Sequence, residues 1–176
     1  IFFFSWPVSA GHCEIGVFST PQTSLDVAFF SPGFYIPESY FPSMLSEEQV
    51  DAFLARYVKD GKVIAVGTNQ LGDLFLRKLG LLCEQNKWET PLIPTSTSQI
   101  HTAQQFHLPL TTLNEQEVDI AFEFVSQADG DYNFIKRNTY SLVRDKMIAQ
   151  SAGEMICILP AKEMYEKVQG QVPFEI

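Results

Sequence analysis

The stretch VDIAFEFVSQADGDYNFIKRNTYSLVRDKMIA, from Val118 to Ala149, decides the fold. It begins with a run from Val118 to Phe124 that is apolar enough for a buried strand. An acidic turn at 129–131 and Lys136 follow, and a helix is expected to begin near Ser141. In open α/β sheets, ligands bind where a strand runs through a loop into a helix N-terminus. If the protein has a site, the sequence predicts that it lies here.

Strand-like and helix-like segments alternate on both sides of this stretch. Buried strands are expected at 62–66, 90–98 and 155–159, and helices at 45–60, 71–86 and 98–106. Such alternation is typical of a parallel sheet that is covered by helices. The sequence therefore predicts an α/β domain over residues 45–176, with a Rossmann-like open sheet, mostly parallel, and helices on both faces.

Residues 1–44 differ in composition from the rest of the chain. They hold five of the ten prolines and eleven of the 23 aromatic residues, but no Lys or Arg. Frequent proline excludes a long helix, and so many aromatic residues need something to pack on. We expect an irregular, extended arm that either lies on its own domain or docks onto a partner protein. The docking candidates are Phe2, Phe3, Phe4, Trp6, Phe29, Phe30, Phe34 and Tyr35.

Charge and spacing exclude several functions. A net charge of −9 argues against nucleic acid as a partner. The three cysteines are far apart, and the three histidines lack metal-ligand spacing, so no metal, cofactor or disulfide framework is expected. No apolar run reaches the ~20 residues of a membrane span. The chain opens on Ile1, so a targeting segment could be missing and a mitochondrial location is only a guess.

The central stretch resembles the ribose-5-phosphate isomerase A family. The matching positions are Asp119, Asp129, Asn133, Ile135, Lys136, Leu142, Arg144, Lys146 and Ala149. Pro94-Thr95-Ser96, Leu108 to Leu113 and Val172 to Ile176 also resemble family segments. The resemblance implies the family's fold over residues 45–176, without a counterpart of its C-terminal third.

The resemblance also implies where a sugar-phosphate isomerase would keep its site. Glu123 and Ser126 stand where the family has two aspartates, and Asp145 stands where it has its catalytic-base glutamate; among the polar site residues only Lys136 is unchanged. Residues 137–140 replace four glycines. The family's sugar-phosphate loop corresponds to Gly67 and Thr68 followed by Asn69, Gln70 and Leu71, and Ser96 and Lys162 match two further positions.

These replacements predict vestigial rather than catalytic residues. Glu123 and Asp145 keep their acidity but shift each carboxylate by about a methylene length, and a ~1 Å misplacement can lower a rate on the order of 10²-fold. Without the family's lid, the cleft is expected to be open to water. We therefore expect a catalytically inactive accessory subunit in a larger, possibly organellar, assembly, with no small-molecule ligand. The alternative is an active or ligand-sensing sugar-phosphate protein.

Overall fold

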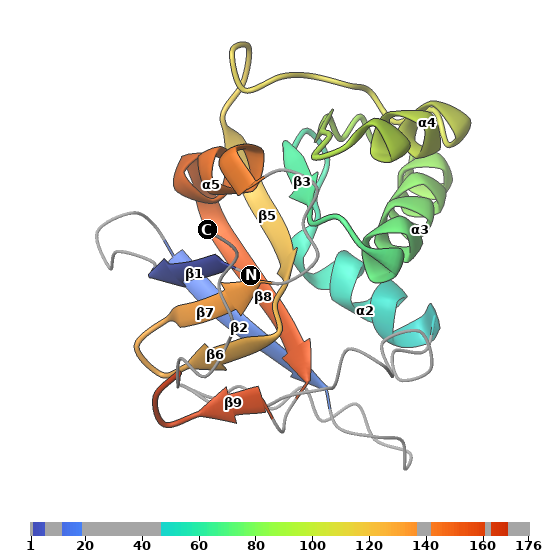
Figure 1. The fold of residues 1–176 in the computed structure, drawn as a ribbon. Helices are drawn as coiled ribbons and strands as arrows, with labels where there is room; N and C mark the ends of the chain where they lie inside the picture. The colour runs from blue at the N-terminus through green and yellow to red at the C-terminus, as the bar shows by residue number, and fades with distance from the viewer. Residues whose placement is uncertain (1, 6–11, 19–46, 137–141, 161–162, 169–176) are drawn as a thin grey trace.

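The computed structural model describes residues 2–5, 12–18, 47–136, 142–160 and 163–168. Figure 1 shows a parallel sheet with helices on both sides and a smaller sheet beside it. The elements are β1 (Phe2–Ser5), β2 (His12–Phe18), α2 (Glu47–Tyr57), β3 (Ile64–Val66), α3 (Gln70–Asn86), β4 (Leu92–Ile93), α4 (Thr97–Gln105), β5 (Val118–Phe124), β6 (Gln127–Asp129), β7 (Asn133–Lys136), α5 (Leu142–Ser151), β8 (Ala152–Pro160) and β9 (Met164–Tyr165).

The larger sheet has the strand order β2-β8-β5-β3-β4, and every pair in it is parallel. Helices α2, α3 and α4 cover one face, and α5 lies on the other (Figure 1). Each face of the sheet has its own hydrophobic core, and neighbouring residues of β5 point into different cores. Phe122 packs with α2 and α3, whereas Ala121 belongs to the cluster that contains Ile148 of α5. The α/β class with helices on both faces is thus confirmed.

The order of the strands creates a topological switch point between β3 and β5. From β3 the chain goes to β4 on one side, and from β4 it returns past β3 to β5 on the other side. The carboxyl ends of β3 and β5 are therefore neighbours, and the Gly67 N–H donates to the Phe122 carbonyl across them at 2.7 Å. Crevices at such points are where open α/β sheets bind ligands.

Some predicted strands keep their bounds in the structure and others do not. The strand expected from Val118 to Phe124 has these bounds as β5. The strand expected over 90–98 is reduced to Leu92–Ile93, because Pro94 cannot donate to a ladder and Ser96 caps helix α4.

In the described residues no helix is long and apolar enough to cross a membrane.

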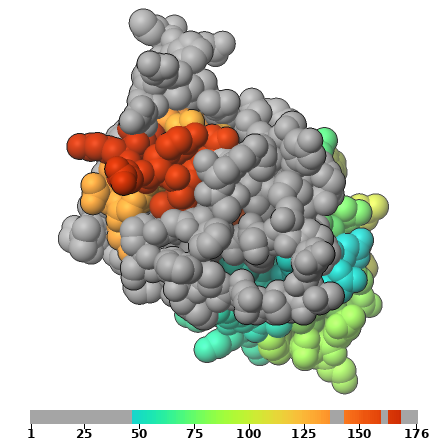
Figure 2. All heavy atoms as spheres, turned by 90° about the horizontal axis from the view of Figure 1, so that it is seen from below, coloured from blue at the N-terminus to red at the C-terminus, as the bar shows by residue number. Residues whose placement is uncertain are grey.

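The smaller sheet has the order β1-β7-β6-β9. Figure 2 shows the described C-terminal residues, which include β9, beside the residues of β6 and β7. Buried Asp129 holds this region together, because it accepts hydrogen bonds from the backbone N–H groups of Asp131, Asn133 and Val168, each at 3.0 Å. Although burial opposes it, these bonds hold the pKa of Asp129 below its usual value.

The described part of the N-terminal segment corrects the expectation of an irregular arm. Phe2–Ser5 forms β1, antiparallel to β7, and His12–Phe18 forms β2, parallel to β8. Prolines 7 and 21 lie outside these strands, and the aromatic residues of β1 and the β-branched Ile15 and Val17 of β2 favour extended pairing. Residues 2–5 and 12–18 thus belong to the sheets of the domain. The remainder of the arm, with Trp6, Phe29, Phe30, Phe34 and Tyr35, lies outside the described residues.

Candidate functional site

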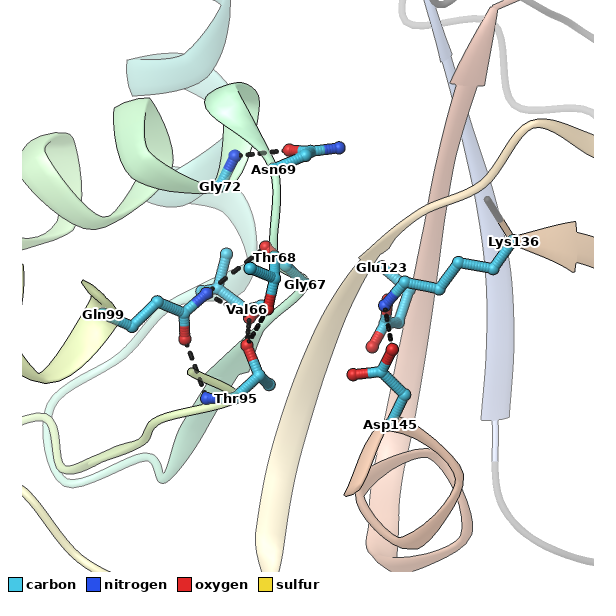
Figure 3. A network of polar contacts seen from close by, with 10 residues as sticks. All are labelled: Val66, Gly67, Thr68, Asn69, Gly72, Thr95, Gln99, Glu123, Lys136 and Asp145. Atoms are coloured by element: carbon cyan, nitrogen blue, oxygen red, sulfur yellow. Dashed lines mark hydrogen bonds and ion pairs between the residues drawn. The ribbon is translucent and has the colours of Figure 1, made fainter. Parts of the chain in front are cut away.

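Three charged side chains meet beside the switch point. Glu123 comes from the carboxyl end of β5, Lys136 from the end of β7 and Asp145 from the first turn of α5 (Figure 3). Lys136 Nζ lies 2.5 Å from Glu123 Oε2 and 3.0 Å from Asp145 Oδ2. Each of the three residues is 2% exposed. We call these residues the acid–lysine triad.

The triad is closed to water, which corrects the expectation of an open cleft at these residues. Burial raises the pKa of the Glu123 carboxyl, the charge of Asp145 adds to the rise, and Lys136 opposes it. Burial works to lower the pKa of Lys136, but the two carboxylates together hold it above its usual value. Inside the protein, the charge of Lys136 therefore takes the place of water in stabilising the two carboxylates.

Gly67 brings the loop after β3 against the triad. A Cβ atom at this position would lie 2.7 Å from Glu123 Oε2 and 3.3 Å from the Phe122 carbonyl oxygen. Only a residue without a side chain fits there without displacing Glu123. The loop after β3 and Glu123, one of the candidate catalytic positions, are thus in direct contact.

The hydroxyl that should hold a phosphate is engaged within the protein. Thr68 Oγ1 lies 2.6 Å from Thr95 Oγ1, and the Thr95 hydroxyl in turn donates to the Val66 carbonyl at 2.9 Å (Figure 3). Thr68 is 7% exposed and Thr95 is 3% exposed. A buried hydroxyl with these partners gives up hydrogen bonds if it turns towards an anion.

The N-terminus of α3 is likewise capped by the chain itself. Asn69 Oδ1 accepts the Gly72 N–H at 2.8 Å, and Leu71, which follows Gln70, is buried at 4% exposure. A helix N-terminus attracts anions because its first N–H groups have no partner in the helix. Here Asn69 takes one of these donors.

Two further predicted positions, Ser126 and Ser96, take part in hydrogen bonds with the backbone. Ser126 lies in the link between β5 and β6 and donates its backbone N–H to the carbonyl of Ile135 on β7 at 2.7 Å. Ser96 is the N-cap of α4 and accepts the Gln99 N–H. Lys162 and residues 137–140 lie outside the described residues. Among the described residues there is no group of three or more His, Cys, Asp or Glu that could hold a metal ion.

Gln99 is a residue of this region that was not predicted from the sequence. This buried side chain donates to the Val66 carbonyl at 2.8 Å and accepts the Thr95 N–H at 2.9 Å, so it joins the ends of β3 and β4. The signal was present, because Ser96 and Gln99 have the spacing of a capping box. In this protein, however, the Gln99 side chain turns inward to the strand ends.

Comparisons with known proteins bear on the same region. A family model described as "Ribose 5-phosphate isomerase A (phosphoriboisomerase A)" matches residues 91–176. Ribose-5-phosphate isomerase A of Methanocaldococcus jannaschii is 30% identical over 122 residues, which is 69% of this chain and 54% of that protein. Ribose-5-phosphate isomerase A 2 of Oceanobacillus iheyensis is 34% identical over 134 residues, 74% of this chain and 60% of that protein.

Solved structures agree. The ribose 5-phosphate isomerase A structure from M. jannaschii matches with a TM-score of 0.64 and 29% identity, covering 72% of this chain and 57% of that one. The Plasmodium falciparum enzyme matches with a TM-score of 0.62 and 27% identity, covering 69% and 52%. The fold and the sequence together make this chain a partial relative of the ribose 5-phosphate isomerase A family. It spans only 54–60% of the two curated relatives described.

Proposed function

We propose that this chain is a catalytically inactive relative of the isomerases, which serves as a structural, accessory subunit of a larger assembly. One observation carries the proposal. The three charged residues at the candidate catalytic positions are buried and pair with one another. A carboxylate that acts as a general base must instead be free to reach the proton of a substrate.

The energetics of the triad support inactivity. A substrate that draws Asp145 away from Lys136 leaves buried charge without its partner, and breaking such a pair costs about 3–5 kcal/mol. Glu123 adds a second obstacle, because its carboxylate is also paired with Lys136 inside the protein, at 2.5 Å. Binding energy that is used to open the triad is not available to stabilise a transition state.

The loop after β3 supports the absence of a sugar-phosphate ligand. Asn69 caps α3, and the Thr68 hydroxyl is paired with Thr95. A phosphate would have to displace the Asn69 side chain and turn the Thr68 hydroxyl away from its partner. These changes remove existing hydrogen bonds, each worth roughly 0.5–1.5 kcal/mol.

The alternative function is that of an active or ligand-sensing sugar-phosphate protein. It is favoured by the contact between Gly67 and Glu123, which keeps the loop and the acidic residues together at the switch point. Under this alternative the triad is the closed, ligand-free form of a site that opens when ribose 5-phosphate binds.

Thermal unfolding in the presence of ribose 5-phosphate separates the two. A ligand at 100 times its dissociation constant stabilises a fold by about 2.7 kcal/mol. We expect no change in melting temperature up to ~10 mM ribose 5-phosphate, a concentration 100-fold above a Kd of ~0.1 mM. A saturable rise that is absent with inorganic phosphate, and is lost in a folded Thr68→Val variant, supports the alternative.

The assembly is tested on the native protein. We expect the chain to elute from gel filtration of an organelle-enriched, mitochondrial extract at a size well above its 19.9 kDa. A single peak at the size of the isolated chain, in every cell fraction, contradicts the accessory-subunit role. This outcome is independent of ligand binding, so it tests the structural half of the proposal alone.

A further inference from the structure

The two N-terminal strands complete two different sheets. Among the strands that the structure describes, β1 pairs only with β7, at the end of the smaller sheet, and β2 pairs only with β8, at the end of the larger one. The four residue pairs of β1 and the seven of β2 join the segment to the body of the domain. Each of these strands therefore covers an edge that the rest of the described chain leaves open.

Both strands are in register with the triad. Ile15 on β2 is opposite Cys157 on β8, and Cys157 is opposite Glu123 on β5, so the three form one row across the sheet. On the smaller sheet, Phe2 is opposite Lys136. The chain that supplies β1 and β2 thus completes the two sheets that carry Glu123 and Lys136 of the triad.

The edges under these strands need a cover. In β8 the side chains from Met155 to Leu159 are all buried, and Phe134, Ile135 and Lys136 of β7 are buried as well. A strand edge of this kind, with its N–H and C=O groups unpaired, is a template for pairing with another chain. Any replacement for β1 and β2 must offer the same hydrogen bonds in the same register.

In the sequence, a long segment separates the two N-terminal strands from the rest of the domain. The 28 residues from 19 to 46 separate Phe18 from Glu47, the first residue of α2. An extended chain of this length reaches up to roughly 90 Å, which exceeds the diameter of a small domain. Residues 2–18 of one copy can therefore reach the edges of β7 and β8 on a neighbouring copy.

We propose that β1 and β2 are exchanged reciprocally between two copies of this chain. Each copy then covers the β7 and β8 edges of the other, with the hydrogen bonds that the single chain makes within itself. The monomer and the exchanged dimer make the same contacts, so the segment 19–46 decides the equilibrium between them. A strand attached through such a segment has an effective concentration in the millimolar range, which favours the monomer in dilute solution. The proposal does not depend on whether the triad has lost its chemistry.

A disulfide can report which copy supplies β2. In a Cys13→Ser, Cys83→Ala background, an Ile15→Cys substitution places a second thiol opposite the native Cys157. Adjacent strands hold their Cα atoms within the range that a disulfide spans. Equal amounts of isotopically light and heavy protein are unfolded together, refolded at about 1 mM or about 1 μM, and oxidised with glutathione disulfide. The first concentration is near the effective concentration of the attached strands, and the second is far below it.

The expected product is a covalent dimer that forms mainly in the concentrated sample. About half of its 15–157 cross-linked peptides join a light chain to a heavy one, because a random mixture pairs the labels equally, whereas the dilute sample yields mainly light–light and heavy–heavy peptides within monomers. Val17→Cys in the same background is the matched control and gives little cross-link, because residue 17 is opposite Leu159.

The proposal is overturned if every 15–157 cross-link lies within one chain at both concentrations, or if none forms in the folded protein. Should the Ile15→Cys variant fail to fold, the Phe3→Cys, Ile135→Cys pair reports on β1 and β7 in the same way. Cross-links between light and heavy chains support the exchange, and cross-links only within one chain overturn it.

Discussion

Gly67 and Glu123 approach each other so closely that a Cβ atom on residue 67 would lie 2.7 Å from Glu123 Oε2. This contact joins the loop after β3 to the buried triad across the switch point of the sheet. Because Glu123 is fixed by Lys136, it cannot move aside without loss of the ion pair. The glycine is therefore required by packing, whether or not a ligand binds.

Gly67→Ala is expected to destabilise the protein by about 1–3 kcal/mol, the usual effect of extra volume in a packed interior. Urea unfolding followed by circular dichroism measures the change. Gly153→Ala is the matched control, since its added Cβ would meet its nearest atom, the Asp119 carbonyl oxygen, at 3.4 Å, an ordinary contact. Equal effects of the two substitutions would show that Glu123 does not occupy the space beside Gly67.

Lys136→Met removes the only cation of the triad and leaves two buried carboxylates side by side. We expect a loss of about 3–5 kcal/mol at pH 7. The loss becomes smaller as the pH falls from 7 to about 4, because burial raises the pKa of Glu123, Lys136 no longer opposes that rise, and this carboxylate then takes up a proton. Urea unfolding at the two pH values measures both effects.

Lys78 provides a matched control for this substitution. It also lies between two carboxylates, 2.9 Å from Glu47 and 3.0 Å from Asp51, but these acids are 69% and 53% exposed. Because water screens such pairs, Lys78→Met should cost less than about 1 kcal/mol. If Lys136→Met and Lys78→Met have similar effects, the triad is not a buried ion cluster in solution.

The pH dependence of stability reports on Glu123. Its pKa is raised in the folded state, first by burial, so the fold favours the protonated form. This contribution is complete below the usual value of 4.5 and is lost as the pH rises through the raised pKa. Glu123→Gln mimics the protonated form, so its stability relative to wild type should rise between pH 4 and pH 8, values chosen to bracket that range. A relative stability that falls over this range contradicts the assignment.

Asn69 is expected to act as a cap rather than as part of a phosphate site. Asn69→Ala should destabilise the protein by about 1 kcal/mol, because the Gly72 N–H loses its acceptor. Asn69→Asp keeps an acceptor and places a negative charge at the helix N-terminus, so its stability should match or exceed that of wild type. Thermal unfolding of the two variants checks this order.

Much of the fold follows from local patterns in the sequence. The run from Val118 to Phe124 is apolar apart from Asp119 and Glu123, so β5 could be predicted with its bounds. The N-terminal strands could not, because frequent proline hid two short runs whose strand character depends on pairing with β7 and β8. Pairing partners that are more than a hundred residues away leave no local signal.

The candidate site, like the fold, could be predicted from the sequence only in part. Resemblance placed Glu123, Lys136 and Asp145 in one region, and the structure brings them together. Their burial and mutual pairing depend on how β7 and α5 pack on β5, which no spacing in the sequence specifies. The same is true of the Thr68 and Thr95 hydroxyls, which pair only because the ends of β3 and β4 are adjacent.

Turnover of ribose 5-phosphate tests the central claim most directly, because carboxylates that are buried and paired with Lys136 are not available as a base. The purified chain, at micromolar concentration, is incubated with ribose 5-phosphate while formation of the ketose phosphate is followed, alongside Asp145→Asn. The account predicts no product above the rate without protein, for either chain. Product formation that follows the protein peak through gel filtration, and disappears in a folded Asp145→Asn variant, would contradict it.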